Sequence, residues 1–257
     1  MRKTTRNTFL LAVAVIALSA GVYAELRREE GMRPTPLTTL EPQNVKTLTI
    51  HCTDCRERRF EHRANGWWMT QPYPLRADAA VVSRLLAIAG APIRKTLDAK
   101  DYDVAKLGLD PPTVTLQLDD VTLEFGGEEP IEHDRYVRVA GKLVRVPDRF
   151  GARLMESPEV EIDRHLIDID ATVVEVSIDG AAPRADLAKS WKDAAALQMQ
   201  PGAAHDGINV VVELADATKM QFSIHRDNDH YFVNRGDIAL DYVIGEAQAQ
   251  ALLGKAN

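Results

Sequence analysis

The sequence predicts an α+β protein: two related subdomains of antiparallel β-hairpins with short helices, preceded by one N-terminal transmembrane helix. Three observations support this prediction. A basic start leads into an apolar run, alternating apolar residues flank turn-forming residues along the remaining chain, and the order of these elements in the first half returns in the second. We therefore divide the chain into an anchor or signal peptide (1–24), a stalk (25–42), a first subdomain (43–164) and a second, shorter subdomain (165–257).

The apolar run, residues 9–24, determines the compartment of everything that follows it. At about 1.5 Å per residue, a helix over residues 7–24 nearly spans the ~30 Å hydrocarbon core of a bilayer. Val22-Tyr23-Ala24 also has the form of a signal-peptide cleavage site before Glu25, so an uncleaved anchor and a cleaved leader are both open. Both alternatives export the rest of the chain, and the basic residues before the run favour a cytoplasmic N-terminus.

The composition predicts a globular exported part and argues against nucleic-acid binding. The chain is 45% hydrophobic and 27% charged, which is typical of a protein with a packed core. Its net charge is -7 and no cluster of Lys and Arg follows the leader, so the basic face that nucleic acids require is missing. Residues 25–42 are charged and then rich in Pro and Thr, as expected of a stalk.

The first subdomain is predicted to open with a hairpin and a helix. Residues 45–50 alternate as a strand, and residues 60–69 form its partner. Asp78 is a suitable N-cap for an amphipathic helix, which Gly90 and Pro92 end.

Two further hairpins and a short helix complete the first subdomain. Residues 101–107 predict a helical turn that ends at Gly108. Alternation then predicts strand pairs over residues 114–125 and 136–146, and residues 150–155 have a helical pattern.

The second half repeats this order, which indicates an internal duplication. The corresponding segments are residues 173–178 for the opening strand, 210–222 and 231–236 for the later hairpins, and 246–253 for the last helix. Trp191 is matched to Trp67 or Trp68, and the second copy is expected to lack most of the first helix. The extra residues of the first copy include its cysteines, which we interpret as a local insertion.

Cys52 and Cys55, in the motif C-T-D-C, are the only cysteines of the chain. In an oxidising compartment they are predicted to form a structural disulfide, which for so short a loop contributes about 2 kcal/mol. A redox pair would favour a helix N-terminus, whereas this pair follows a strand pattern. Two alternatives remain. One is a metal site that the cysteines form with His51 and His62, although zinc usually takes four well-spaced ligands. The other is a pair of free thiols.

Several motifs together resemble a known family. They are Gly66-Trp67-Trp68, Pro72, Ala77-Asp78, the run Leu107-Gly108-Leu109-Asp110-Pro111-Pro112, Phe125-Gly126 and Arg135-Tyr136-Val137. With the N-terminal apolar run, the chain resembles the domain of unknown function 4340 family of bacterial membrane-anchored proteins, some of them encoded beside ABC transporter components of the gliding-motility type. The resemblance favours the uncleaved anchor and implies a single-pass protein of the bacterial inner membrane with its C-terminal domain in the periplasm.

The family motif residues are expected to serve folding. Trp67 and Trp68 are predicted to pack in the core rather than stack on sugars, and Tyr136 is predicted to be half buried on its hairpin. Gly108 is expected to supply a left-handed helix cap, and Pro111-Pro112 to fix the exit into the next strand. The resemblance supplies no catalytic residues.

Nothing in the sequence predicts catalysis, a metal or a cofactor. The motifs of serine hydrolases, zinc proteases and phosphate-binding loops do not occur. His225 and His230, with two aspartates between them, are interpreted as a polar hairpin turn. The aspartates that surround His165, at 163, 168 and 170, are interpreted as part of a solvated linker between the two halves.

We therefore predict a non-catalytic membrane-anchored accessory protein, an auxiliary component of an ABC transporter system. Its partners are predicted to be the membrane, through the N-terminal helix, and transporter subunits, with any small-molecule ligand unknown. A groove between the subdomains is the expected site. The alternatives are a thiol-redox protein that uses Cys52 and Cys55, and a cell-envelope glycan-binding module that uses Trp67 or Trp68.

Overall fold

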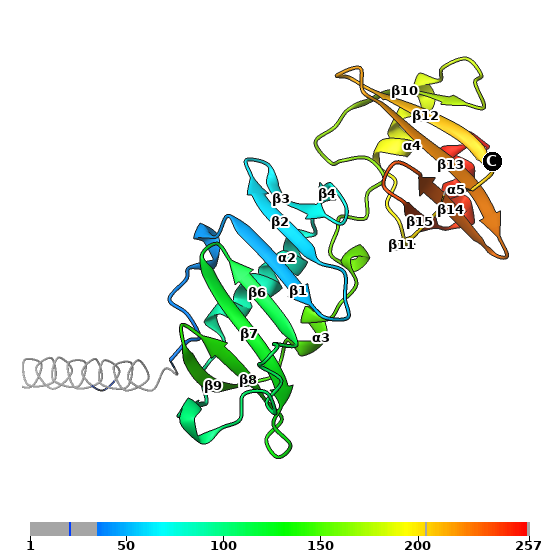
Figure 1. Ribbon diagram of the computed structural model, residues 1–257. Coiled ribbons are helices and arrows are strands. Elements are labelled where there is room, and N and C mark those ends of the chain that lie inside the picture. Colours follow the sequence, from blue (N-terminus) through cyan, green and yellow to red (C-terminus); the bar gives the residue numbers. More distant parts are fainter. Residues whose placement is uncertain (1–20, 22–34, 204, 256–257) are drawn as a thin grey trace, which may run out of the picture.

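The computed structural model describes Gly21 and residues 35–203 and 205–255. Two antiparallel sheets with a few short helices make up this part of the chain, so the α+β class is confirmed (Figure 1). Apart from Gly21, the predicted membrane helix, its cleavage site and the stalk as far as residue 34 lie outside the described residues. Within the described residues, no helix combines the length and the apolar character needed to cross a bilayer.

The first sheet has nine strands in the order β4-β3-β2-β1-β6-β7-β8-β9-β5. Its strands are β1 (Thr47–Cys52), β2 (Arg58–Arg63), β3 (Gly66–Gln71), β4 (Leu75–Arg76), β5 (Lys95–Leu97), β6 (Val114–Leu118), β7 (Val121–Glu128), β8 (Asp134–Val139) and β9 (Lys142–Pro147). The helices of this half are α2 (Ala79–Leu86), α3 (Gly151–Leu154) and the 3-10 helices η1 (Pro42–Asn44), η2 (Ala87–Gly90), η3 (Ala99–Asp101) and η4 (Pro158–Val160). The later hairpins predicted for this half are present, but the predicted partner strand over residues 60–69 is two strands, β2 and β3, which pair with each other, and β1 pairs with β2.

The second sheet has six strands in the order β10-β12-β13-β14-β15-β11. Its strands are β10 (Val173–Ile178), β11 (Gln198–Pro201), β12 (Ile208–Leu214), β13 (Lys219–Asp227), β14 (His230–Arg235) and β15 (Leu240–Ile244). The helices of this half are η5 (Ala185–Leu187), α4 (Ala188–Lys192) and α5 (Glu246–Leu252).

The strand orders of the two sheets correspond. Six neighbouring strands of the first sheet, β1-β6-β7-β8-β9-β5, occupy the same positions as β10-β12-β13-β14-β15-β11 in the second, and the first sheet adds β2, β3 and β4. The predicted match of Trp191 to a tryptophan of β3 is wrong, because Trp191 lies on helix α4, which precedes β11 as α2 precedes β5. The second copy therefore keeps a short helix, and the strands β2 to β4 are what it lacks.

Helix α2 begins where the sequence predicts. The Asp78 carboxylate accepts hydrogen bonds from the backbone N–H groups of Ala80 (2.8 Å) and Val81 (3.1 Å), which satisfies two of the free donors of the first turn. The buried residues Val82 and Leu85 lie on the face that packs against the first sheet. The helical conformation continues through η2, which ends at Gly90.

The linker that joins the halves, residues 155–172 between α3 and β10 and including η4, is paired with both of them. The Asp78 N–H bonds to Glu161 O and the Asp163 N–H to Arg76 O, each at 2.9 Å, and further along Leu166 N bonds to Ala194 O at 3.0 Å. The prediction of a solvated linker is wrong for this stretch, because Ile162, Leu166 and Ile167 are buried among core residues of both halves. Since the linker is hydrogen-bonded first to one half and then to the other, it positions the second sheet on the first.

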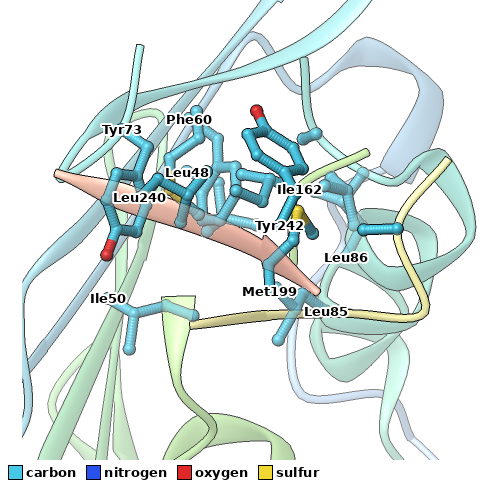
Figure 2. Close-up of a cluster of buried hydrophobic side chains, with 14 of the residues drawn as sticks. Leu48, Ile50, Phe60, Tyr73, Leu85, Leu86, Ile162, Met199, Leu240 and Tyr242 are labelled. Carbon is cyan, nitrogen blue, oxygen red and sulfur yellow. The ribbon is translucent and has the colours of Figure 1, made fainter. Parts of the chain in front are cut away.

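Buried side chains of both halves belong to one hydrophobic core cluster. Figure 2 shows Leu48 and Phe60 of the first sheet, Leu85 of helix α2 and Ile162 of the linker in the same cluster as Tyr242 of β15. Each of these side chains is at most 1% exposed. The apolar contact across the linker contributes to holding the halves together.

Candidate functional site

A pocket of about 180 Å³ lies where the two halves meet. Strands β3 and β4, the linker, and strands β12 to β14 all contribute to its wall. Apolar side chains such as Leu75 and Met220 line it together with charged ones, namely Arg76, Asp168 and Arg235. The pocket has the mixed lining expected of a small-molecule or peptide site, and it lies where a groove is expected between the subdomains.

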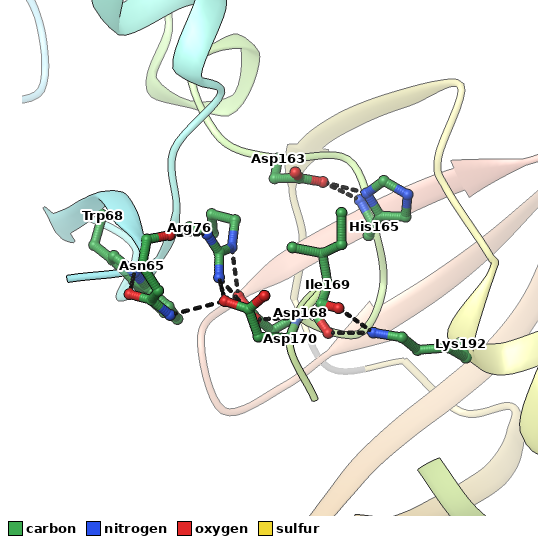
Figure 3. A network of polar contacts seen from close by, with 9 residues as sticks. All are labelled: Asn65, Trp68, Arg76, Asp163, His165, Asp168, Ile169, Asp170 and Lys192. Atoms are coloured by element: carbon green, nitrogen blue, oxygen red, sulfur yellow. Dashed lines mark hydrogen bonds and ion pairs between the residues drawn. The ribbon is translucent and has the colours of Figure 1, made fainter. Parts of the chain in front are cut away.

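Arg76 is the centre of the polar network at this pocket (Figure 3). Its guanidinium donates from Nε to Asp168 Oδ2 at 2.9 Å and from Nη2 to Asp168 Oδ1 at 3.1 Å. It also pairs with Asp170 and donates to the carbonyl oxygen of Asn65. Because its two carboxylate partners lie on the linker, Arg76 ties the end of the first sheet to the beginning of the second half.

The second half also binds this part of the linker, residues 168–169, through hydrogen bonds to its backbone. Lys192, at the end of α4, donates from Nζ to the carbonyl oxygens of Asp168 (2.9 Å) and Ile169 (2.6 Å). Burial acts to raise the pKa of Asp168, but the hydrogen bonds from Arg76 and from the Asp170 N–H outweigh it and hold that pKa below its usual range. The bond to Asp168 in turn raises the pKa of Arg76. Both groups therefore stay charged at neutral pH.

A histidine and an aspartate of the linker pair with each other at the pocket. The Nδ1 atom of His165 lies 2.5 Å from Asp163 Oδ1, which also accepts the His165 N–H at 2.8 Å. The described lining contains no serine, threonine or cysteine to which such a pair could transfer a proton in nucleophilic catalysis. The arrangement therefore suits recognition of a ligand better than acyl transfer.

The two neighbouring tryptophans of β3 have different environments. Trp67 packs against the core cluster, with its ring 5.1 Å from that of His62. Trp68 lines the pocket and donates from Nε1 to Asn65 Oδ1 at 3.0 Å. The guanidinium groups of Arg63 and Arg76, from the strands on either side of β3, lie over the Trp68 ring at 4.9 and 5.3 Å from its centre.

The most specific family motif lies away from this pocket, against strands β7 to β9 at the other end of the first sheet (Figure 1). Gly108 has the left-handed conformation expected of it, with φ of +69°. Leu109 is fully buried beside Leu97 and Leu143, and the half-buried Tyr136 packs on this small cluster. Pro111 and Pro112 follow in the turn that leads into β6, and Pro72 ends β3. The motif builds a loop that covers the sheet.

Replacing Gly126 with alanine is expected to destabilise the protein by about 1–3 kcal/mol. A Cβ atom at this position would collide with the carbonyl oxygen of Leu107 and lie 2.9 Å from Leu109 Cγ, so the motif loop would have to lift from the sheet. Gly127→Ala is the matched control, because its Cβ would lie 3.6 Å from the same oxygen, an ordinary contact. Urea unfolding of both variants measures the difference, and equal stabilities would contradict this account of the loop.

A disulfide joins Cys52 and Cys55 and closes the turn between β1 and β2. Cys52 is 4% exposed, which suits a structural bond better than a redox-active one. Of the histidines considered as metal ligands beside it, His51 lies 3.2 Å from the Glu57 carboxylate and His62 packs with its ring tilted against that of Trp67.

Two arginines that follow the disulfide turn bind buried carboxylates of the linker. Arg56 pairs with Glu159, which also accepts the Tyr73 hydroxyl, and Arg58 Nη1 lies 2.7 Å from Glu161 Oε1. Sequence reasoning missed these pairs because their members lie 103 positions apart. The alternation of Arg58 with the buried Phe60 along β2 was the available indication that this arginine faces the interior.

The histidines of the second sheet do not converge. His225 on β13 stacks on Phe232, with ring centres 5.1 Å apart, and lies beside the tilted ring of His205 at 4.5 Å. Burial has the largest effect on the pKa of His225 and lowers it, and the neighbouring His205 lowers it further. His230 is exposed and pairs with Asp227 across the hairpin, so the predicted polar turn is confirmed. Among the described residues, no group of three or more His, Cys, Asp and Glu side chains could hold a metal ion.

Fold and pocket together define a duplicated α+β protein with its main polar cluster at the junction of two sheets. The model of the family described as "Domain of unknown function (DUF4340)" matches residues 67–222, from β3 to β13, and the chain belongs to this family. The matched region includes the linker and most of the junction pocket. No curated protein and no solved structure matches the chain significantly.

Proposed function

We propose that this protein is a non-catalytic, membrane-anchored accessory of an ABC transporter system, with residues 35–255 forming a periplasmic binding domain. The observation that carries the proposal is the junction pocket, whose charged groups are already paired. Arg76 binds Asp168 and Asp170, and Asp163 holds His165. Such groups offer fixed hydrogen-bond partners and a fixed shape to a partner segment, and this favours binding and positioning over proton transfer.

The sequence supports the anchor and the compartment. The basic start and the apolar run of residues 9–24 are typical of a signal-anchor, which places the following domain outside the cytoplasm of a bacterium. The disulfide between Cys52 and Cys55 is compatible with an oxidising compartment. The transporter partner follows from the resemblance to membrane-anchored proteins encoded beside transporter genes.

A pull-down of the full-length protein from its native membrane in gentle detergent tests the proposal. We expect an ABC permease or ATPase to be recovered by mass spectrometry, together with bait peptides that precede Glu25. A bait that begins at Glu25 and brings no transporter subunit would contradict both the anchor and the partner. Recovery of a transporter by a cleaved bait would keep the partner and overturn the anchor.

Arg76→Gln is expected to loosen the linker and to increase tryptic cleavage after Arg164 on the order of tenfold. The reason is that charge-assisted hydrogen bonds of this kind contribute about 1.5–3 kcal/mol, and cleavage of a transiently opened segment follows its opening free energy. The fragment ending at Arg164 is quantified by mass spectrometry. Arg63→Gln is the matched control, because Arg63 also lies over Trp68 but pairs only with the exposed Glu61, at 3.5 Å. Equal cleavage of the two variants would show that the ion pairs of Arg76 do not hold the linker on the first sheet.

Glycan binding is the second candidate, because Trp68 lines the pocket beside Asp163 and His165. It is less well supported than the accessory role, since the guanidinium groups of Arg63 and Arg76 occupy positions over the indole ring where a sugar would stack. Titration with fragments of cell-envelope glycan separates the two. Glycan binding requires a change in tryptophan fluorescence that Trp68→Phe removes and Trp67→Phe retains.

A further inference from the structure

A second groove, on the helical side of the first sheet, is bordered by three arginines. It has a volume of about 290 Å³, and its border is formed by Arg84 of α2, Arg149, and Arg153 of α3. Its remaining described lining is apolar apart from one glycine, and it includes the buried Ile88 and Phe150. The groove thus combines a cationic border with an apolar floor.

The three arginines differ from most other arginines of the first half in their partners. Arg56, Arg58, Arg59, Arg63, Arg76, Arg94, Arg135, Arg138 and Arg145 each lie within 4 Å of a carboxylate. Within residues 35–203 and 205–255, no carboxylate lies that close to Arg84, Arg149 or Arg153, all of which are exposed. Arg164, which lies outside the groove, is the other described arginine of this half without a carboxylate within 4 Å. The charge of the three groove arginines is available to an anion from outside the chain.

The cationic and apolar surface continues beyond the groove. An adjoining pocket is lined by Arg84 and Arg153 again, with Val160, which is 47% exposed. Its acidic lining residues are Glu161, which is bound by Arg58, and the exposed Glu156. An exposed valine beside two unpaired arginines suits the interface of a membrane, where both headgroups and acyl chains are within reach.

The groove lies directly beside the point from which the chain runs towards its N-terminus. The backbone of residues 35–38 is hydrogen-bonded along the groove wall: Leu37 N to Ala91 O at 2.9 Å and Ile93 N to Thr35 O at 2.8 Å. Ten residues, 25–34, separate this point from the apolar run, and at most about 3.3–3.6 Å per residue limits their reach to roughly 35 Å. A groove held so close to the proposed anchor can touch the bilayer surface.

We propose that this arginine groove binds anionic phospholipid in the membrane that anchors the protein, and that it orients the periplasmic domain on the bilayer. The guanidinium groups of Arg84, Arg149 and Arg153 match phosphate oxygens in charge and geometry, and the apolar floor receives the glycerol and the upper acyl chain. The chain has a net charge of -7 even with the three basic residues of the leader included, so the rest of the domain is acidic and is repelled by an anionic membrane, and the groove selects one orientation. This inference rests on the anchored topology of the proposed function.

The test uses the full-length protein in nanodiscs of phosphatidylcholine alone or with one third phosphatidylglycerol. Arginines are modified with phenylglyoxal, and the modified positions are quantified by mass spectrometry. We expect modification of Arg84, Arg149 and Arg153 to slow at least fivefold in the anionic discs, since one arginine near an anionic surface is worth about fivefold in affinity. Arg59 and Arg226, each more than half exposed elsewhere, should react equally in both discs.

A matched pair of variants extends the test. The triple change of Arg84, Arg149 and Arg153 to Gln should reduce the phosphatidylglycerol retained in native mass spectrometry on the order of a hundredfold, the product of three such factors. The same changes at Arg59, Arg184 and Arg226 should leave retention unchanged.

Three outcomes overturn the inference. They are equal reactivity of the groove arginines in both discs, protection by free glycerol phosphate to the same degree as by lipid, and protection that requires an added acidic protein. Failure of the proposed function is distinguishable from these, because a protein cleaved before Glu25 would not remain in either disc, whereas a retained protein with unprotected arginines refutes the groove alone.

Discussion

Replacing Arg58 with methionine is expected to lower the free energy of unfolding by about 3–5 kcal/mol at pH 8. The arginine is fully buried and Glu161 is 1% exposed, so the variant leaves a carboxylate in the interior without its cationic partner. It also removes the arginine donor from the carbonyl oxygen of Leu154 and one of two donors from that of Arg153, which keeps the Glu156 N–H. Methionine fills a similar length of the cavity, so the loss reports on the charge rather than on a void.

The loss should be smaller at pH 5 than at pH 8, because a protonated Glu161 is less costly to bury alone. Urea titration followed by tryptophan fluorescence measures both values on the full-length protein in detergent. Arg63→Met is the matched control: this arginine is on the same strand, and its exposed pair with Glu61 contributes about 0–1 kcal/mol. A loss for Arg58→Met that does not exceed the control would show that the buried pair has no role in stability.

Arg58 connects the disulfide turn to the candidate site. The turn closed by Cys52 and Cys55 presents Arg56 and Arg58 to Glu159 and Glu161, and the linker then continues past Arg76 to the junction pocket. Each ion pair joins the first sheet to the linker rather than to another strand. The position of the second sheet therefore depends on polar contacts made by three arginines as well as on the shared core.

Local features of the fold were predictable because they depend on neighbours in the chain. Asp78 caps its helix through the next two or three residues, and Gly108 ends a turn through its own backbone freedom. The hairpins follow from alternation and short turns, and the order of these elements was enough to indicate the duplication. The junction was not predictable in the same way, because the partners of Arg58 and Arg76 lie more than 90 positions away.

The predictions for the linker and for Trp191 were wrong for a related reason. The charged residues around Ile162, Leu166 and Ile167 made the linker resemble a solvated connection, although the spacing of its apolar residues already allowed burial on two sides. Trp191 was matched by residue type to a strand tryptophan, whereas the surrounding sequence Ala-Lys-Ser-Trp-Lys is compatible with a helix. The three arginines of the groove were unremarkable in the sequence, since only the fold brings α2 and α3 together.

Raising the pH from 5 to 8 is expected to reduce the contribution of Glu161 to stability by about 2–3 kcal/mol. Burial raises the pKa of Glu161 from 4.5 to about 7, and the attraction of Arg58 offsets only part of that effect. A raised pKa means that the folded state holds this proton more tightly than the unfolded state. The resulting stability is fully present below pH 4.5 and is lost as the pH rises through about 7.

The comparison of wild type with Glu161→Gln isolates this contribution from other titrating groups. His225 acts in the opposite direction in the same range, because its lowered pKa makes the folded state lose stability as the pH falls. That effect is common to both proteins and cancels in the difference between them.

We expect the free energy of unfolding of the glutamine variant to be close to that of wild type at pH 5 and to exceed it increasingly towards pH 8, since its amide keeps an acceptor for Arg58 without a buried carboxylate. Glu61→Gln, at an exposed pair on the strand that carries Arg58, should show a constant difference across the range. If the difference in unfolding free energy between Glu161→Gln and wild type were also independent of pH, Glu161 would keep its ordinary pKa, and the attraction of Arg58 would outweigh the effect of burial.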